Sequence, residues 1–438
     1  MATIRLKKGY DLNLKGRIVD PAIVSSEKSA LYAIVPDDFV GLTPRMDKRE
    51  GDHVSAGEAL FHDKTFEQIQ VTSPVSGVVK EVRRGQRRHI DAIVIEPDGQ
   101  NTMVKHDTGG DALSVMLASG LWAMLRQRPY DIVPSPDVRP RDIFVTGFDS
   151  APLAPDLMVV LGDDKQYINK GVDVLKSLTD GDVYLGFKPD EALDVPGAVV
   201  NTFKGPHPAG NAGVQVANIK PVNKGEVVWT LDIVTLARIG RLFTTGTVSY
   251  DTVVAVTGEC ADQPHYVRAT MGCQMSSLLG NADHSGSRII SGNALSGWRV
   301  EADGFLRAPY RHVTMIPEVS KADEFMGWAS LCPSRFSIYR TFTSWLAGKR
   351  EVSMDARIKG GERAIVRTDE YDDMLPMDIY AEFLIKAIIT FDIDKMEQLG
   401  IYEVAPEDFA LAEYACTSKL ELQRIVREGL DRLRNEMS

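Results

Sequence analysis

Residues 40–96 contain the pattern that most restricts how this chain can fold. Short apolar runs alternate with turn-forming residues, as in the strings GDHVSAG (residues 51–57), SPVSGVV (residues 73–79) and IVIE (residues 93–96). Glycine, proline, serine and aspartate at such intervals end each run after a few residues. The pattern therefore predicts many short strands joined by tight turns.

The first two of these strings resemble the turn and the following strand of biotinyl/lipoyl-like barrel-sandwich domains. Because the two strings occur together and in the same order, we expect a barrel-sandwich hybrid fold. We assign it to residues 1–100, with the N-terminal segment included.

A basic segment follows the second string, on a chain that is acidic overall, with 50 Lys and Arg against 61 Asp and Glu. It contains Lys80, Arg83, Arg84, Arg87 and Arg88. We interpret it as a docking patch for an acidic partner or for anionic lipid headgroups, where each basic residue contributes about 1 kcal/mol. The alternative is a solvated hairpin tip. The net charge of −11 argues against binding to nucleic acid through phosphate neutralisation.

Strand and helix patterns alternate in the next part of the chain. They occur in the order 143–147 (strand), 164–178 (helix), 183–187, 198–200 and 227–229 (strands), 231–242 (helix) and 252–256 (strand). Such alternation is typical of an α/β layer with a largely parallel sheet. We expect a Rossmann-like α/β domain at residues 101–257, which makes the chain a multidomain α/β protein.

The last two predicted domains differ in pattern. A strand, a helix and a second strand at residues 266–292 suit a β-grasp (SLBB-like) domain, assigned to residues 258–308. Residues 309–438 show apolar stripes at helical spacing, including residues 377–391 and a last helix for which Thr417 is the expected N-cap. We predict a C-terminal helical bundle there.

The string KGPHPAGNAG (residues 204–213) is the most unusual in the chain. Prolines on both sides of His207 restrict the backbone, so the imidazole is expected on a stiff loop. A histidine held in this way can donate a proton to a reduced quinone oxygen. The alternative is a histidine that caps a structural loop. The glycine spacing fits neither a dinucleotide-binding motif nor a P-loop.

A second candidate cluster comprises Arg126, Arg128 and Tyr130. The two guanidinium groups can bind an acidic group through paired hydrogen bonds, and the tyrosine ring can stack on a ligand. The alternative is solvated charge at the end of a helix. We keep these three residues and His207 as candidates for a quinone site or a subunit interface, and we assign no catalytic residue.

The spacing of the cysteines argues against a metal or iron–sulfur site, and the length of the apolar runs argues against a transmembrane segment. Cys260, Cys273, Cys332 and Cys416 form no C-x-x-C pair, so we expect neither a zinc site nor an iron–sulfur cluster on this chain. The longest stretch without a charged side chain, at residues 205–219, is 15 residues long, whereas a membrane-spanning helix needs about 20 apolar residues. We therefore expect no transmembrane segment.

The domain order and six strings resemble the NqrA family, the A subunits of Na+-translocating NADH:quinone oxidoreductases. The strings are TSPVSG (72–77), RGQRR (84–88), RPY (128–130), FVT (144–146), GPHPAG (205–210) and PVNKGE (221–226). A related plan occurs in the RnfC protein of the Rnf complex and in the flavin-bearing NADH subunit of respiratory complex I.

The resemblance implies a peripheral subunit on the cytoplasmic face of the bacterial inner membrane, not catalytic alone, that supports quinone reduction coupled to Na+ export. It places NADH, FAD, FMN, riboflavin, 2Fe-2S, quinone and Na+ on other subunits. The main partner would be the membrane subunit that carries flavin and quinone.

Flavin-binding relatives carry a glycine-rich loop where this chain has bulky side chains at residues 120–129, so we expect no flavin on this chain. Two alternatives remain open. One is a free-standing flavin- or nucleotide-binding oxidoreductase, and the other is an assembly scaffold without quinone contact.

Overall fold

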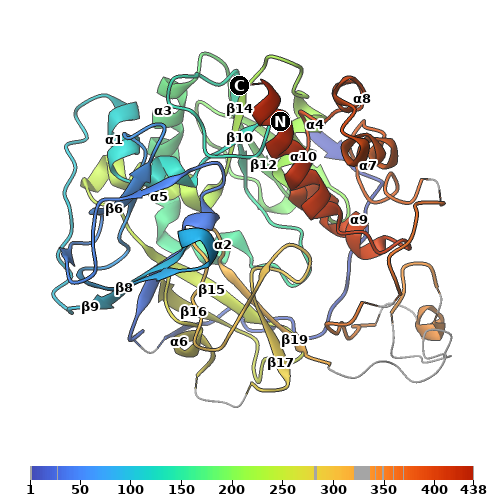
Figure 1. Cartoon of the computed structure of the whole chain (residues 1–438), viewed down its shortest axis with the longest axis horizontal. Coiled ribbons are helices and arrows are strands. Elements are labelled where there is room, and N and C mark those ends of the chain that lie inside the picture. Colours follow the sequence, from blue (N-terminus) through green and yellow to red (C-terminus); the bar gives the residue numbers. More distant parts are fainter. Residues whose placement is uncertain are drawn as a thin grey trace.

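The computed structural model describes residues 2–26, 28–280, 284–319, 336–340, 342–347, 350–358, 360–367 and 369–437. Cys332 lies outside these residues, as does the rest of 320–335 in the predicted segment 309–438. Four sheets carry the β structure of the described chain, two of six strands, one of four and one of three. Figure 1 shows them as one assembly with helices around the larger sheets.

Two small sheets form the strand-rich N-terminal part that the turn pattern predicts. One contains β3 (Tyr32–Ile34), β9 (Ile90–Pro97), β8 (Gly77–Arg84) and β5 (His53–Val54); the other contains β4 (Pro44–Met46), β6 (Ala59–Asp63) and β7 (Gln70–Thr72). Leu60, Phe61 and Val79 are fully buried between them. Gly77 permits the close pairing of β8 and β9, because a Cβ there would lie 2.1 Å from the carbonyl oxygen of Glu96.

A larger, six-stranded sheet lies next to these two small sheets in the chain's domain order and is called the second sheet below. Its strand order is β1-β13-β12-β11-β14-β10. Its strands are β1 (Ala2–Arg5), β13 (Val199–Lys204), β12 (Val183–Phe187), β11 (Asp142–Thr146), β14 (Val228–Asp232) and β10 (Arg126–Arg128). The first five are parallel, and β10 pairs with β14 in the antiparallel direction. The largely parallel sheet agrees with the strand and helix alternation, but β1 comes from the N-terminal range that was assigned to the barrel-sandwich domain.

Five helices accompany this sheet. They are α1 (Ala112–Ala118), α2 (Leu157–Leu161), α3 (Ile168–Leu178), α4 (Ala212–Ile219) and α5 (Ile233–Thr245). Helices α3 and α5 approach closely because Gly240 has no side chain; a Cβ there would lie 1.9 Å from the carbonyl oxygen of Tyr167. The helix patterns predicted at residues 164–178 and 231–242 correspond to α3 and α5.

The third sheet is mixed, with the order β18-β17-β19-β15-β16-β2. Its strands are β18 (Trp298–Val300), β17 (Ser287–Ser291), β19 (His312–Pro317), β15 (Asp251–Thr257), β16 (His265–Thr270) and β2 (Ile23–Ser25), and α6 (Met275–Leu279) lies between β16 and β17 in the chain. Strand β15 pairs with β16 and β19, although residues 252–256 fall in the range predicted for the preceding domain. Strand β2 is a second contribution from the N-terminal segment.

Strand β19 lies within residues 309–438, the range predicted as a helical bundle, but it belongs to the third sheet, so the prediction was wrong for the start of that range. The described chain from residue 381 onward is helical. It contains α7 (Ala381–Thr390), α8 (Ile393–Gln398), α9 (Ala410–Ala415) and α10 (Leu422–Met437), which Figure 1 shows gathered on one side of the molecule. Two expectations for these helices were wrong. Phe383, which belongs to the apolar stripe predicted at residues 377–391, is 56% exposed rather than buried. Thr417 does not cap α10; its backbone N–H and its hydroxyl each donate to the carboxylate of Glu370, at 3.0 Å.

Candidate functional site

A cleft of about 720 Å³ lies at the carboxyl edge of the second sheet. Its walls come from β1, from the N-terminal segment that follows it, and from the loops after β11, β12 and β13. Open parallel sheets bind their ligands at this edge, because loops from several strands converge there. The cleft is therefore the structure's main candidate for a binding site.

His207 lies directly behind the wall of this cleft. Its Nδ1 is 3.1 Å from Oγ of Ser150, which lines the cleft, and its backbone N–H donates to Asp11 at 2.8 Å. The side chain is 4% exposed, and burial lowers the pKa of His207 to about 4. The imidazole is therefore neutral near pH 7, and its Nε2 has no hydrogen-bond partner among the described residues.

Arg128 is buried against the C-terminal helical part. Its Nη1 lies 2.9 Å from a carboxylate oxygen of Asp408 and 2.9 Å from the carbonyl oxygen of Glu403, and its Nη2 lies 3.4 Å from Glu407. The side chains of Arg128 and Asp408 are 1% and 0% exposed. This guanidinium therefore binds carboxylates of its own chain.

Arg126 and Tyr130 also make contacts within the chain. Arg126 donates to the carbonyl oxygens of Ala123, at 3.2 Å, and of Asp38, at 2.5 Å. The Tyr130 ring packs edge-on against Tyr402, with 6.5 Å between the ring centroids. Neither residue contacts His207, and none of the three lines the cleft.

Arg128 and the loop that carries His207 nevertheless both contact the segment Glu407–Asp408. Asn211 donates from its side chain to the carbonyl oxygen of Glu407 at 3.2 Å. A Cβ at Gly213 would lie 2.4 Å from the carboxylate of Asp408, so the start of α4 packs directly on that side chain. The structure thus joins two of the predicted clusters through the pair Glu407–Asp408, which the sequence analysis did not single out.

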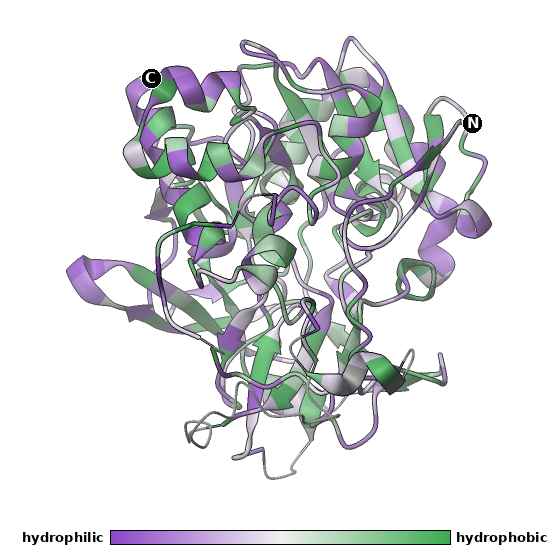
Figure 2. Ribbon diagram, turned by 90° about the vertical axis from the view of Figure 1, so that its right-hand side faces the viewer, coloured by the Kyte–Doolittle hydropathy of each residue, from purple (hydrophilic) through white to green (hydrophobic). Residues whose placement is uncertain are grey.

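The basic segment forms the tip of the β8–β9 hairpin. Figure 2 shows a hairpin with a hydrophilic tip, at the height of β8 and β9 in Figure 1, that extends from the body of the protein. All five cationic side chains are exposed. Two of them have acidic neighbours, Lys80–Glu96 at 3.3 Å and Arg83–Glu81 at 3.0 Å. No carboxylate in the described part of the chain forms an ion pair with the other three, Arg84, Arg87 and Arg88.

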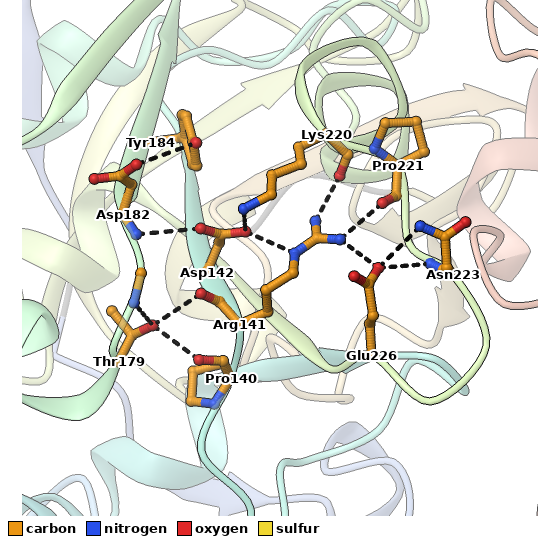
Figure 3. Close-up of polar contacts among 11 residues, drawn as sticks. Pro140, Arg141, Asp142, Thr179, Asp182, Tyr184, Lys220, Pro221, Asn223 and Glu226 are labelled. Atoms are coloured by element: carbon orange, nitrogen blue, oxygen red, sulfur yellow. Dashed lines mark hydrogen bonds and ion pairs between the residues drawn. The ribbon is translucent and has the colours of Figure 1, made fainter.

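A charged network at the opposite, amino edge of the second sheet escaped the sequence analysis (Figure 3). Asp142 lies 2.7 Å from Arg141 Nε and 2.8 Å from Lys220 Nζ, and it accepts from the backbone N–H of Asp182 at 3.1 Å. Arg141 also donates to the carbonyl oxygens of Lys220 and Pro221, at 2.7 and 2.9 Å, and to Glu226. The network fixes the loop between α4 and β14 to the start of β11. The network includes Pro221 and Glu226 of the string PVNKGE (residues 221–226), which was the only sequence feature to point to this edge of the sheet.

Replacing Asp142 with asparagine is expected to lower the free energy of unfolding by about 2 kcal/mol, because charge-assisted hydrogen bonds contribute about 1.5–3 kcal/mol. Burial alone would raise the pKa of Asp142, but Lys220, the N–H of Asp182 and Arg141 outweigh it and hold the pKa below its ordinary value. A depressed pKa gives stability that is present at neutral pH and lost as the pH falls towards that pKa. Urea unfolding at pH 7 and pH 4 checks this: the difference between the two proteins should shrink at pH 4.

Three cysteines of the described chain, Cys260, Cys273 and Cys416, carry free thiols. Within the residues that the structure describes, no three His, Cys, Asp or Glu side chains are grouped so that they could hold a metal ion. None of the described helices combines the length and the apolar character that crossing a membrane requires.

Comparison with known proteins finds matches to one protein family along the chain. Three family profiles match in order: the NqrA N-terminal barrel-sandwich hybrid domain at residues 4–98, the NqrA second alpha/beta domain at residues 110–248 and the NQRA C-terminal domain at residues 253–302. Relatives from Yersinia pestis bv. Antiqua and Hahella chejuensis are each 33% identical over 99% of this chain and 100% of their own length. The chain belongs to the NqrA family.

A relative from Rhodopirellula baltica is also 33% identical, over 99% of this chain and 98% of its own length. All three relatives are named as the A subunit of the Na(+)-translocating NADH-quinone reductase. These matches confirm the resemblance drawn from the six strings. They also confirm the barrel-sandwich, α/β and SLBB-like domains that were predicted for this NqrA-family chain.

Proposed function

We propose that this chain is the NqrA component of a Na+-translocating NADH-quinone reductase and supports quinone reduction coupled to Na+ export. The observation that carries the proposal is the 33% identity to the relative from Y. pestis, which extends over 99% of this chain and the whole of the relative. The chain is not catalytic alone, and it acts as a peripheral subunit on the cytoplasmic face of the bacterial inner membrane. Its main partner is the membrane subunit that carries flavin and quinone.

The finer division of the chain belongs to the same proposal. Residues 101–257 form a Rossmann-like domain, which the parallel sheet order β13-β12-β11-β14 supports. Residues 1–100 hold the barrel-sandwich hybrid, residues 258–308 the β-grasp domain and residues 309–438 a helical bundle. Strands β1, β2, β15 and β19 pair with sheets outside their assigned ranges, which means that these domains share strands.

NADH, FAD, FMN, riboflavin, the 2Fe-2S cluster, quinone and Na+ act on other subunits, and this chain carries no flavin. The segment that corresponds to the glycine-rich loop of flavin-binding relatives packs in the core instead. Trp122 is fully buried, its ring centroid lies 4.9 Å from that of Trp229, and its indole N–H donates to the carbonyl oxygen of Pro134 at 2.9 Å. An FMN phosphate needs exposed backbone N–H groups, which a buried tryptophan covers.

His207 is the better of the two quinone candidates, because the Arg126–Arg128–Tyr130 cluster is occupied by groups of its own chain. Photo-labelling of the whole complex with a quinone analogue tests this contact. Label on the cleft loops around Ser150 and His207 would support it. Label confined to the membrane subunits would favour an assembly scaffold instead. A stoichiometric flavin spectrum of the purified chain would contradict the assignment of flavin to other subunits.

The β8–β9 hairpin tip is the proposed docking patch for the membrane part of the complex. Changing Arg84, Arg87 and Arg88 to glutamate is expected to weaken binding of the chain to membranes that contain the other subunits by about a hundredfold or more, since each cation contributes about 1 kcal/mol. The matched control changes three exposed lysines on another surface, Lys165, Lys170 and Lys176, to glutamate. Co-sedimentation measures both. Equal binding of the two variants would exclude the hairpin as the contact.

A further inference from the structure

The cleft at the carboxyl edge of the second sheet is bordered by two cationic side chains without a carboxylate partner. Arg5 and Lys204 lie opposite each other in register, at the carboxyl ends of the parallel strands β1 and β13, and both line the cleft. Among the described residues, neither forms an ion pair or a side-chain hydrogen bond. Two like charges on adjacent strands repel each other, so an anion between them would be stabilised by both.

Further donors lie on the same wall. Arg17 lines the cleft, and its one side-chain hydrogen bond in the described chain is to Oδ1 of Asn13, at 3.1 Å, which leaves its charge uncompensated. Thr3 points to the same face of β1 as Arg5, because alternate residues of a strand share a face. Its hydroxyl is 2.9 Å from that of Thr202, the residue two positions before Lys204. Guanidinium, ammonium and hydroxyl donors therefore all line this cleft.

The loops after β11 and β12, which also line the cleft, differ in chemistry. Lys188 there is already engaged, since it pairs with Glu191 at 3.2 Å and lies 5.7 Å from the centroid of the Phe148 ring. Four carboxylates line the cleft, and two of them, Asp11 and Asp156, accept the backbone N–H groups of His207 and Met158, at 2.8 Å each. Asp149 and Asp190 supply further carboxylate oxygens, and Asp149 accepts only the N–H of Ala151, at 2.8 Å, which leaves acceptor capacity. Carboxylates of this kind bind the hydroxyl groups of a neutral polar ligand.

We propose that this cleft binds a small organic phosphate ester. Its phosphate would lie between Arg5, Lys204 and Arg17, and its hydroxyl-bearing part would face Asp149 and Asp190. Arginine and lysine together recognise the doubly charged phosphate, and about 720 Å³ is within the size range of small-molecule sites. This site goes beyond the proposed role in the reductase, because it rests on Arg5, Lys204 and Arg17, whereas the proposed quinone contact is at Ser150 and His207.

Isothermal titration calorimetry on the full purified chain tests the site with ribose 5-phosphate, glycerol 3-phosphate and AMP, against ribose and malate. We expect at least one phosphate ester to bind with a Kd below about 1 mM, to bind more weakly as KCl is raised, and to bind more tightly than malate. Arg5→Gln and Lys204→Gln should each weaken binding about tenfold, whereas Lys170→Gln, which removes an exposed lysine outside the cleft, should not.

Three results would overturn the proposal. The first is no binding of any of the three esters, and the second is equal or tighter binding of malate. The third is binding that Arg5→Gln and Lys204→Gln leave unchanged. Because both side chains are exposed, each variant should keep the melting temperature of the parent, so weaker binding can be attributed to the missing cation. Failure here would leave the assembly and photo-labelling tests of the NqrA role unaffected.

Discussion

Replacing Arg128 with alanine is expected to remove about 3–5 kcal/mol from the free energy of unfolding, the usual effect of leaving one member of a buried ion pair alone. The carboxylate of Asp408, 0% exposed, would lose its counterion at 2.9 Å. The carbonyl oxygen of Glu403 would lose its donor as well. Because this pair joins β10 to the C-terminal helical part, we expect α9 and α10 to lose protection first. Urea unfolding and amide hydrogen exchange measure the two effects.

An exposed arginine of the same part of the chain provides the control. Arg424 pairs with Glu421 and Glu428, but all three side chains are more than 60% exposed, so Arg424→Ala should change the stability by less than about 1 kcal/mol. The double substitution Arg128→Met with Asp408→Leu removes both buried charges and should recover much of the loss. If Arg128→Ala unfolds at the same urea concentration as Arg424→Ala, the buried pair does not stabilise the fold.

Local sequence patterns predicted the elements of this fold better than their pairing. The strand at residues 183–187 was predicted with its observed bounds as β12, and the helix at residues 231–242 lies within two or three residues of α5. Each depends on the period of apolar residues in a short window. The positions of β1 and β2 depend on partners far away in the chain, and no local pattern records them.

The candidate site shows the same contrast between local patterns, which were predicted, and long-range contacts, which were not. The residues singled out at 126–130 and 204–213 do lie at special places in the structure, but their partners were not predictable. Arg128 was a candidate for binding an acidic group, with solvated charge as the alternative, and it is buried against Asp408, which is 280 residues away in the sequence. The cleft itself combines β1 with three loops between residues 148 and 205. Unusual local strings thus marked where chemistry is concentrated, while tertiary contacts determine what those residues bind.

Two buried histidines are expected to make this protein sensitive to mild acid. His207 and His312 are 4% exposed, and burial lowers their pKa values to about 4 and about 3. His312 contacts the hydroxyl of Thr257 through Nε2 at 2.7 Å, while its Nδ1 has no partner among the described residues. Protonation would thus place a second N–H, and a charge, where no acceptor lies.

The direction of the pH effect follows from the two states. In the unfolded chain each histidine takes up a proton near its ordinary pKa of about 6.5, whereas in the folded chain it stays neutral well below that pH. The unfolded state therefore binds more protons below about pH 6.5, and the free energy of unfolding falls as the pH falls. Between pH 7 and pH 5 the loss should be on the order of 2 kcal/mol for each histidine, since one pKa unit corresponds to about 1.4 kcal/mol.

Urea unfolding of His207→Gln and His312→Gln at pH 7 and pH 5 measures this contribution. Each variant should lose about 2 kcal/mol less than the parent between the two pH values, and the double variant about 4 kcal/mol less. The readout is the difference between pH values, so a variant that is weaker at both remains informative. Full pH dependence in the double variant would mean that both imidazoles accept protons in the folded state, and that the carboxylates alone account for acid unfolding.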